Sequence, residues 1–417
     1  MTPSRDILAL GLGLEKPWKI VDQWLDTDKS PHELHIRISA DRGASFPCPR
    51  CGEFCKAHDF KEFTWRHLNF FQHHCYLTAD VPRIKCSEHG VRRVSVPWAR
   101  EGSQFTLLFE QAAMSLVREM PVSAAARHME ITDKRLWRIV DHYVDKAVSK
   151  LDLSSLVALG LDETSVRGHE YVTVFIDLDR ASRPVIFATP GKGKECLKAF
   201  RAHLEKHGGK QENVAEIVCD MSPSFLSAAG EQFDQAMITV DWFHVVKLFT
   251  DALEKVRRSE QKQQGFPKSV RWAVLKGEEK AKSERQQQAL EELETSGFAT
   301  AKAFRIKEML RWVRHSASAQ SAKWRITHFI KHAQKQIENE TLLKPVQRAL
   351  TTFKELAELI SRRWVSKHTN ARLEGLNSLF QAAKSRARGY RNERTFITMI
   401  YLIAAPVQDL LKGAARG

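Results

Sequence analysis

Apolar residues alternate in strand-like runs through the first hundred positions of the chain, and then they recur at helical spacing. The strand-like runs cover residues 18–24, 33–39 and 74–84. Three helical patterns follow, over 105–120, 122–129 and 132–150. The third helix has one apolar face, and its first two turns carry Lys134, Arg135 and Arg138. This pattern predicts a helix-turn-helix that binds DNA, although an ordinary helical hairpin with a solvated basic face has the same pattern.

A second strand-rich stretch opens with a short apolar run, Leu156–Leu161, that ends on Asp162. Further strand-like runs cover 171–177, 184–189, 214–219 and 236–240, and helix-like segments cover 194–207 and 225–233. The order β-β-β-α-β-α-β is that of a ribonuclease H-like sheet, in which the first and fourth strands are parallel neighbours. Asp162 and Asp220 end these two strands, so we expect their carboxylates to lie close together.

Two carboxylates held so close repel each other unless a divalent cation neutralises them, which predicts Mg²⁺ or Mn²⁺. The candidate third ligand is Glu374, on a helix that Thr369 or Asn370 can cap. The rival acids have structural interpretations. Glu163 is expected on the opposite face of its strand, Asp177 and Asp179 in a turn, and Asp241 at a helix cap, although Asp241 with His244 could also orient a ligand.

The stretch 251–365 separates the second acid from the third and is rich in Lys, Glu, Gln, Ala and Leu. This composition predicts an all-helical insertion into the core. Its tryptophans are expected in the helical core rather than stacked on DNA bases; they are Trp272, Trp312, Trp324 and Trp364. After the third acid the chain becomes basic around Tyr390, with Lys384, Arg386, Arg388 and Arg391, which favours a surface that follows DNA phosphates.

Seven cysteines, an odd number, argue against a disulfide framework. Cys48 and Cys51 are spaced by two residues and followed by glycine, and Cys86 and His89 repeat that spacing. These four residues predict a tetrahedral Cys₃His site for structural zinc, with no open position for substrate. Two alternatives are that Cys55 replaces Cys51, or that the cysteines are small buried residues.

The 65 lysines and arginines exceed the 50 aspartates and glutamates, so the net charge is +15 and a polyanionic partner is favoured. No apolar run approaches the roughly 20 residues of a membrane span. The sequence therefore predicts a cytoplasmic protein with reduced thiols and no membrane partner.

Several motifs in this order resemble a DDE transposase of bacterial insertion sequences, of the ISL-three family. The motifs are Gly160-Leu161-Asp162-Glu163, Val218-Cys219-Asp220-Met221-Ser222, Asp241-Trp242-Phe243-His244-Val245-Val246, Thr369-Asn370 with Leu373-Glu374-Gly375-Leu376-Asn377, and Arg388-Gly389-Tyr390-Arg391-Asn392. The resemblance implies catalysis by Asp162, Asp220 and Glu374 with two Mg²⁺ or Mn²⁺ ions. It also implies double-stranded DNA, both element ends and target, as the partner, a homodimer on that DNA, and a nucleoid-associated bacterial protein.

The expected fold is multidomain, α+β and α/β. Its expected parts are a zinc-binding domain (1–100), a helix-turn-helix (101–150), a ribonuclease H-like core (151–250 and 366–417) and the helical insertion (251–365). The expected function is DNA cleavage at the element's ends, followed by strand transfer into target DNA. Two alternatives are a purely hydrolytic nuclease of the same fold and a non-catalytic DNA-binding regulator derived from a transposase.

Overall fold

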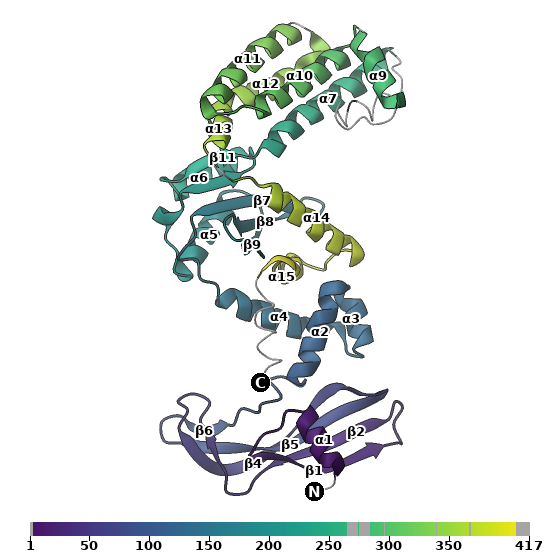
Figure 1. The fold of residues 1–417 in the computed structure, drawn as a ribbon, viewed down its shortest axis with the longest axis vertical. Coiled ribbons are helices and arrows are strands. Elements are labelled where there is room, and N and C mark those ends of the chain that lie inside the picture. Colours follow the sequence, from purple (N-terminus) through teal and green to yellow (C-terminus); the bar gives the residue numbers. More distant parts are fainter. Residues whose placement is uncertain are drawn as a thin grey trace. The chain divides into compact units, whose positions relative to one another are not determined.

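The computed structural model describes residues 3–264, 274, 284–295, 297–338, 340–366 and 368–405. The chain forms two compact units, one within residues 1–147 and the other over 148–405. Both contain a sheet and several helices (Figure 1). Among the described residues, no helix combines the length and the apolar composition that crossing a bilayer requires.

The first unit begins with α1 (Pro3–Gly11) and a six-stranded sheet. Its strands are β1 (Trp18–Asp26), β2 (Glu33–Ala40), β3 (Ser45–Pro47), β4 (Phe54–Phe70), β5 (His73–Cys86) and β6 (Gly90–Arg93). They lie in the order β1-β2-β5-β4-β3, with β6 also paired to β5. The predicted runs are confirmed as β1, β2 and β5. The long strand β4 was not predicted, because of its residues only Trp65 is fully buried and its apolar alternation is weak.

The first unit continues with the three predicted helices, which are confirmed as α2 (Leu107–Glu119), α3 (Val122–His128) and α4 (Asp133–Ser149). Thr106 begins α2 with a side-chain cap on the N–H of Phe109. The carboxylate of Glu110 is fully buried and links α2 to α4, because it accepts a hydrogen bond from the Tyr143 hydroxyl.

The second unit contains a five-stranded sheet in the order β11-β10-β7-β8-β9. Its elements are β7 (Ala158–Arg167), β8 (Glu170–Asp177), β9 (Val185–Pro190), α5 (Lys194–Lys206), η1 (Gln211–Asn213), β10 (Glu216–Cys219), α6 (Pro223–Gln232) and β11 (Met237–Val240). The expected parallel pairing of the first and fourth strands is confirmed by β7 and β10. Asp162 does not end β7, contrary to expectation, because antiparallel pairing with β8 extends β7 to Arg167.

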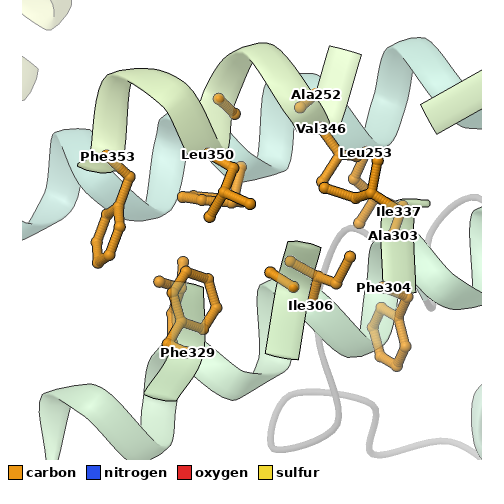
Figure 2. Close-up of a cluster of buried hydrophobic side chains, with 14 of the residues drawn as sticks. Ala252, Leu253, Ala303, Phe304, Ile306, Phe329, Ile337, Val346, Leu350 and Phe353 are labelled. Carbon is orange, nitrogen blue, oxygen red and sulfur yellow. The ribbon is translucent and has the colours of Figure 1, made fainter. Parts of the chain in front are cut away.

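The other elements described in the second unit are helices. They are α7 (Trp242–Gln264), α9 (Glu284–Thr295), α10 (Ala299–Arg314), α11 (Ala319–Ile337), η3 (Thr341–Leu343), α12 (Lys344–Glu355), α13 (Ala357–Ser361), η4 (Arg362–Trp364), α14 (Ala371–Arg386) and α15 (Glu393–Ala404). Helices α7, α10, α11 and α12 share one apolar core, in which Phe329 and Phe353 lie close together (Figure 2). This core forms the helical body between β11 and α14.

The tryptophans of this helical body divide between core and surface. Trp364 packs against Trp242, as expected of a core residue. The core interpretation is wrong for Trp312 and Trp324, whose exposed fractions are 38% and 55%. Their indoles contact each other edge to face on the outside of α10 and α11, because the inward positions of these helices are filled by other apolar side chains. Trp272 lies outside the described residues.

Candidate functional site

Three parallel strands bring three aspartates to the same edge of the second sheet. In the strand register Gly160 lies beside Val218, and Cys219 lies beside Val240. The first aspartate stands two positions beyond Gly160, and the other two directly follow Cys219 and Val240; they are Asp162, Asp220 and Asp241. The β7–β10 pairing stops at Gly160 and Val218, so these carboxylates lie near one another at the C-terminal ends of β10 and β11, where such sheets commonly bind ligands.

The carboxylate of Asp162 is buried and held by several neighbours. Asn377 donates its Nδ2 to Asp162 Oδ2 over 2.8 Å, and the N–H of Glu163 donates to Oδ1, also over 2.8 Å. Burial raises the pKa of Asp162; the imidazole of His244, 3.8 Å from Oδ1, opposes this rise, and the charges of Asp220 and Asp241 add to it. A cation at this position would therefore stabilise the ionised form of Asp162.

Glu374 reaches the same place from α14. Burial, followed by the hydrogen-bonded carboxylate of Asp241 and then the charge of Asp162, raises the pKa of Glu374 to about 8. We name Asp162, Asp220, Asp241 and Glu374 the acidic cluster. Its members repel one another when ionised, and hard divalent cations prefer oxygen ligands, so the donor atoms of the cluster are of the kind that binds such a cation.

Helix α14 carries a polar stripe that follows β7. Besides Asn377 on Asp162, the side chain of Gln381 donates to Thr164 Oγ1 (2.8 Å) and to the Ser165 carbonyl (2.9 Å). Lys384 Nζ donates to that same carbonyl over 2.7 Å. These positions are spaced by three and four residues, so they share one helix face. The stripe sets the rotation of α14, and thereby directs Glu374 toward the acids.

Asp241 and His244 lie directly beside the other acids of the site, whereas the sequence favoured a helix cap for Asp241. Asp241 is 4% exposed, and its Oδ2 has no hydrogen-bond partner within the described part of the chain. Its carboxylate faces Glu374, and the residue directly precedes α7, at the predicted cap position. His244 follows one helical turn later and lies against Asp162. The sequence signal was the strand-like run 236–240, which is followed by Asp241 and, three residues later, by His244.

The remaining acids behave differently from one another. Asp177 accepts the N–H of Asp179 (3.0 Å), as expected of a turn residue, and Asp179 binds His368 Nε2 (2.9 Å). Burial and the charge of Asp220 raise the pKa of Glu163. Although Glu163 was expected on the opposite face of its strand, the charges of the acidic cluster still act on its carboxylate.

A second potential metal site lies in the first unit, where one ligand atom from each of four side chains lies within 4.8 Å of the others. These residues are Cys48, Cys51, Cys86 and His89. Gly52 and Gly90, which follow the two ligand pairs, have φ values of +78° and +66°. Such left-handed conformations favour glycine and let each turn present both ligands to one point.

The distances in this site suit zinc. Ligand atoms about 2.3 Å from a tetrahedral ion lie about 3.8 Å apart. The sulfurs of Cys51 and Cys86 are 3.6 Å apart, and His89 Nδ1 lies 3.6 Å from Cys86 and 3.9 Å from Cys48. Backbone N–H groups of Cys51 and Arg50 hold the pKa of Cys48 below its ordinary value, which favours the thiolate that binds metal.

Cys55 and Cys75 stand outside this set of four. Cys55 groups instead with Glu53 and Cys86. Cys75 lies inside β5 and is 1% exposed, as expected of a core thiol.

The basic residues singled out from the sequence differ in what they contact. Lys134, Arg135 and Arg138 are all exposed on the first turns of α4, and Arg135 also donates to Gln104 Oε1 over 2.7 Å. Among the predicted contacts in the second unit, Arg386, Arg388 and Arg391 are exposed. Tyr390 stacks on Phe396, and burial raises its pKa to about 12, so part of its ring packs against α15.

Three family descriptions match successive parts of the chain. Residues 44–89 match the zinc-finger of transposase IS204/IS1001/IS1096/IS1165. Residues 94–144 match the helix-turn-helix domain of transposase family ISL3, and residues 159–400 match the DDE-type transposase region of that family. The last match covers more than half of the chain and includes the whole acidic cluster.

Two similar proteins extend over most of the chain. The transposase for insertion sequence element IS1557 of Mycobacterium tuberculosis is 26% identical, and the match covers 96% of each chain. The transposase for insertion sequence element IS1001 of Bordetella parapertussis is also 26% identical, over 85% of this chain and 87% of its own.

Proposed function

The chain belongs to the ISL3 family of transposases, and we propose that it cuts DNA at the ends of an insertion sequence and transfers the cut strand into target DNA. The observation that carries this proposal is the acidic cluster at the edge of the second sheet. Asp162, Asp220 and Glu374 are its catalytic residues. Asp241 and His244 complete the site beside them.

The three acids would hold two Mg²⁺ or Mn²⁺ ions. Bound together, such ions activate an attacking oxygen and stabilise the leaving oxygen of a phosphodiester. Asn377 keeps Asp162 in one orientation. The attacking oxygen belongs to water in the cleavage step and to the freed 3′-hydroxyl in the transfer step, and both are in-line displacements at phosphorus.

The proposed catalytic domain is a ribonuclease H-like core interrupted by an all-helical insertion. The strand order β11-β10-β7-β8-β9, with three antiparallel strands followed by two parallel ones, supports this assignment. Support also comes from α14, which returns to β7 after the helical body. The core would comprise 151–250 and 366–417, and the insertion 251–365.

DNA recognition is proposed for both units. A zinc-binding domain is proposed over 1–100 and a helix-turn-helix domain over 101–150. A zinc ion on Cys48, Cys51, Cys86 and His89 would stabilise the fold around the ligand turns of the first domain. The exposed basic side chains at the start of α4 would contact the element's ends. The basic residues after Glu374 would follow the phosphates near the acids. A homodimer on DNA is proposed because two ends must be processed together.

The test is cleavage and joining of a labelled duplex that carries the element's end, in Mg²⁺ or Mn²⁺. The variants are Asp162→Asn, Asp220→Asn and Glu374→Gln, with Asp234→Asn as a matched control on an exposed acid of the same unit. We expect the first three to lose both steps while they still bind the end, and the control to keep both steps.

Two other outcomes favour different functions. Cutting without any joining, under both metals, would favour a hydrolytic nuclease. Binding without either step would favour a regulator that retains the acids. An Asp241→Asn variant as inactive as Asp162→Asn would add Asp241 to the catalytic residues.

A further inference from the structure

Asn370 stands at the start of α14 but does not use its side chain as a helix cap. It occupies the N-cap position, and no capping hydrogen bond from its side chain is present. Asparagine is among the preferred N-cap residues, because its side chain usually accepts an N–H of the first turn. The cap expected from the sequence is therefore absent at Asn370, and its amide is used elsewhere.

The amide of Asn370 joins the two strands that carry the first two acids. It is 1% exposed, and its Nδ2 donates to the carbonyl of Leu161 (3.0 Å) and to that of Val218 (3.3 Å). Leu161 directly precedes Asp162, and Val218 stands two residues before Asp220. The paired register of β7 and β10 ends at Gly160 and Val218, so the amide bridges the strands where their own pairing stops.

The backbone of Asn370 joins the third acid to the same point. Its carbonyl accepts the N–H of Glu374 over 3.0 Å, as the first hydrogen bond of α14. Asn370 is thus hydrogen-bonded to the backbone at three places: next to Asp162, two residues before Asp220, and at Glu374 itself. A shift of Asn370 would change the separations among all three.

Gly160 leaves room for this arrangement. A Cβ at that position would lie 2.6 Å from Asn370 Oδ1, closer than the roughly 3.0 Å at which Cβ atoms contact their neighbours. Oδ1 itself is buried without a hydrogen-bond partner among the described residues. The close approach is therefore set by the two donated bonds and by the small residue opposite.

We propose that Asn370 is a positioning residue, which fixes the separation of Asp162, Asp220 and Glu374 so that they bind divalent cations together. The proposal rests on the proposed function of these acids. Its site is the junction of β7, β10 and α14.

The test measures Mn²⁺ binding to the full chain by calorimetry, with cleavage measured in parallel. The variants are Asn370→Ala, which removes the bridge, and Asn370→Asp, which keeps its size but turns a carboxylate toward two carbonyls. The control is Ser318→Ala, which removes a genuine N-cap from α11 in the same unit. Measurements are made below the unfolding temperature of every variant.

We expect both Asn370 variants to bind Mn²⁺ about 10- to 100-fold more weakly, the range seen when outer partners of metal ligands are lost. Ser318→Ala should bind as the wild type does. High Mn²⁺ should partly restore cleavage by Asn370→Ala.

Wild-type Mn²⁺ affinity in the folded Asn370→Ala variant would overturn the proposal, and so would a wild type that binds no Mn²⁺. If the wild type binds Mn²⁺ but does not cut DNA, the proposed function fails while weaker binding by the variants still supports the role of Asn370.

Discussion

Replacing Glu110 by alanine tests how the first unit holds its helices together. The Glu110 carboxylate is fully buried and accepts three hydrogen bonds, from Arg100 Nε (2.9 Å), Ser103 Oγ (2.7 Å) and the Tyr143 hydroxyl (2.9 Å). Burial, with the neighbouring carboxylate, raises the pKa of Tyr143, so its hydroxyl remains a donor. Removing one partner of a buried ion pair costs about 3–5 kcal/mol, because the other charge is left unpaired.

The matched control is Glu62→Ala in the same unit. Glu62 pairs with Arg37 over 2.9 Å, but its side chain is 55% exposed. Exposed pairs contribute about 0–1 kcal/mol. For a unit of this size, 1 kcal/mol corresponds to roughly 2–4 °C in Tm, so we expect a fall of about 6–20 °C for Glu110→Ala and less than about 4 °C for the control.

Calorimetry of the full chain measures both shifts. The transition of the first unit is identified as the one that moves when a chelator is added. Equal falls in Tm for the two variants would refute the reasoning, because the buried interactions of Glu110 would then contribute no more stability than the exposed pair of Glu62. Binding of the element's end should weaken in parallel with the loss of the folded helices.

Three further predictions concern the metal sites and DNA contacts, and a fourth concerns the helical core. Chelation or Cys86→Ser should unfold the first unit, since structural zinc contributes folding free energy directly; a circular dichroism melt without change under chelator would contradict the zinc assignment. Burial raises the pKa of Glu374 to about 8, so as the proposed metal ligand it would have to lose a proton, and Mn²⁺ affinity should rise with pH up to about 8 and then level off. The Glu374→Gln variant should not show this rise when its Mn²⁺ affinity is measured by calorimetry. A pH profile identical to that of the wild type would count against the raised pKa of Glu374. Arg138→Ala should weaken binding to the element's end. It should also reduce the slope of the logarithm of the DNA association constant against the logarithm of the salt concentration by about 1, as measured by fluorescence anisotropy. An unchanged slope would mean that Arg138 does not contact a phosphate. Phe329→Ala should lower the unfolding free energy by about 3–5 kcal/mol in a denaturant titration, because the ring is fully buried; a loss below about 1 kcal/mol would mean that the core refills the space.

Local patterns in the sequence predicted the elements that bury one face in a regular period. The helices α2 to α4 and the strands β2 and β5 follow such periods, whereas the strands of the second sheet were predicted from continuous apolar runs. The four candidate zinc ligands were also predictable, because each pair is close in sequence and followed by a glycine that permits its turn. The approach of the first and fourth strands followed from the order of elements alone.

Interactions between distant residues were decided only by the tertiary structure. Asn370 lies 209 residues from Leu161, so no local pattern relates its amide to that carbonyl. Distance along the sequence also hides the environment of Asp241, which stands at the predicted cap position before α7 and faces Glu374. β4 escaped prediction because pairing with β5, rather than apolar alternation, defines it. The sequence by itself determined which acids the chain offers and on which elements they lie. The packing of α14 against β7 and β10 decided how these acids are placed relative to one another. Its hydrogen bonds join residues far apart in the sequence, so the period of apolar residues along the chain does not reveal them.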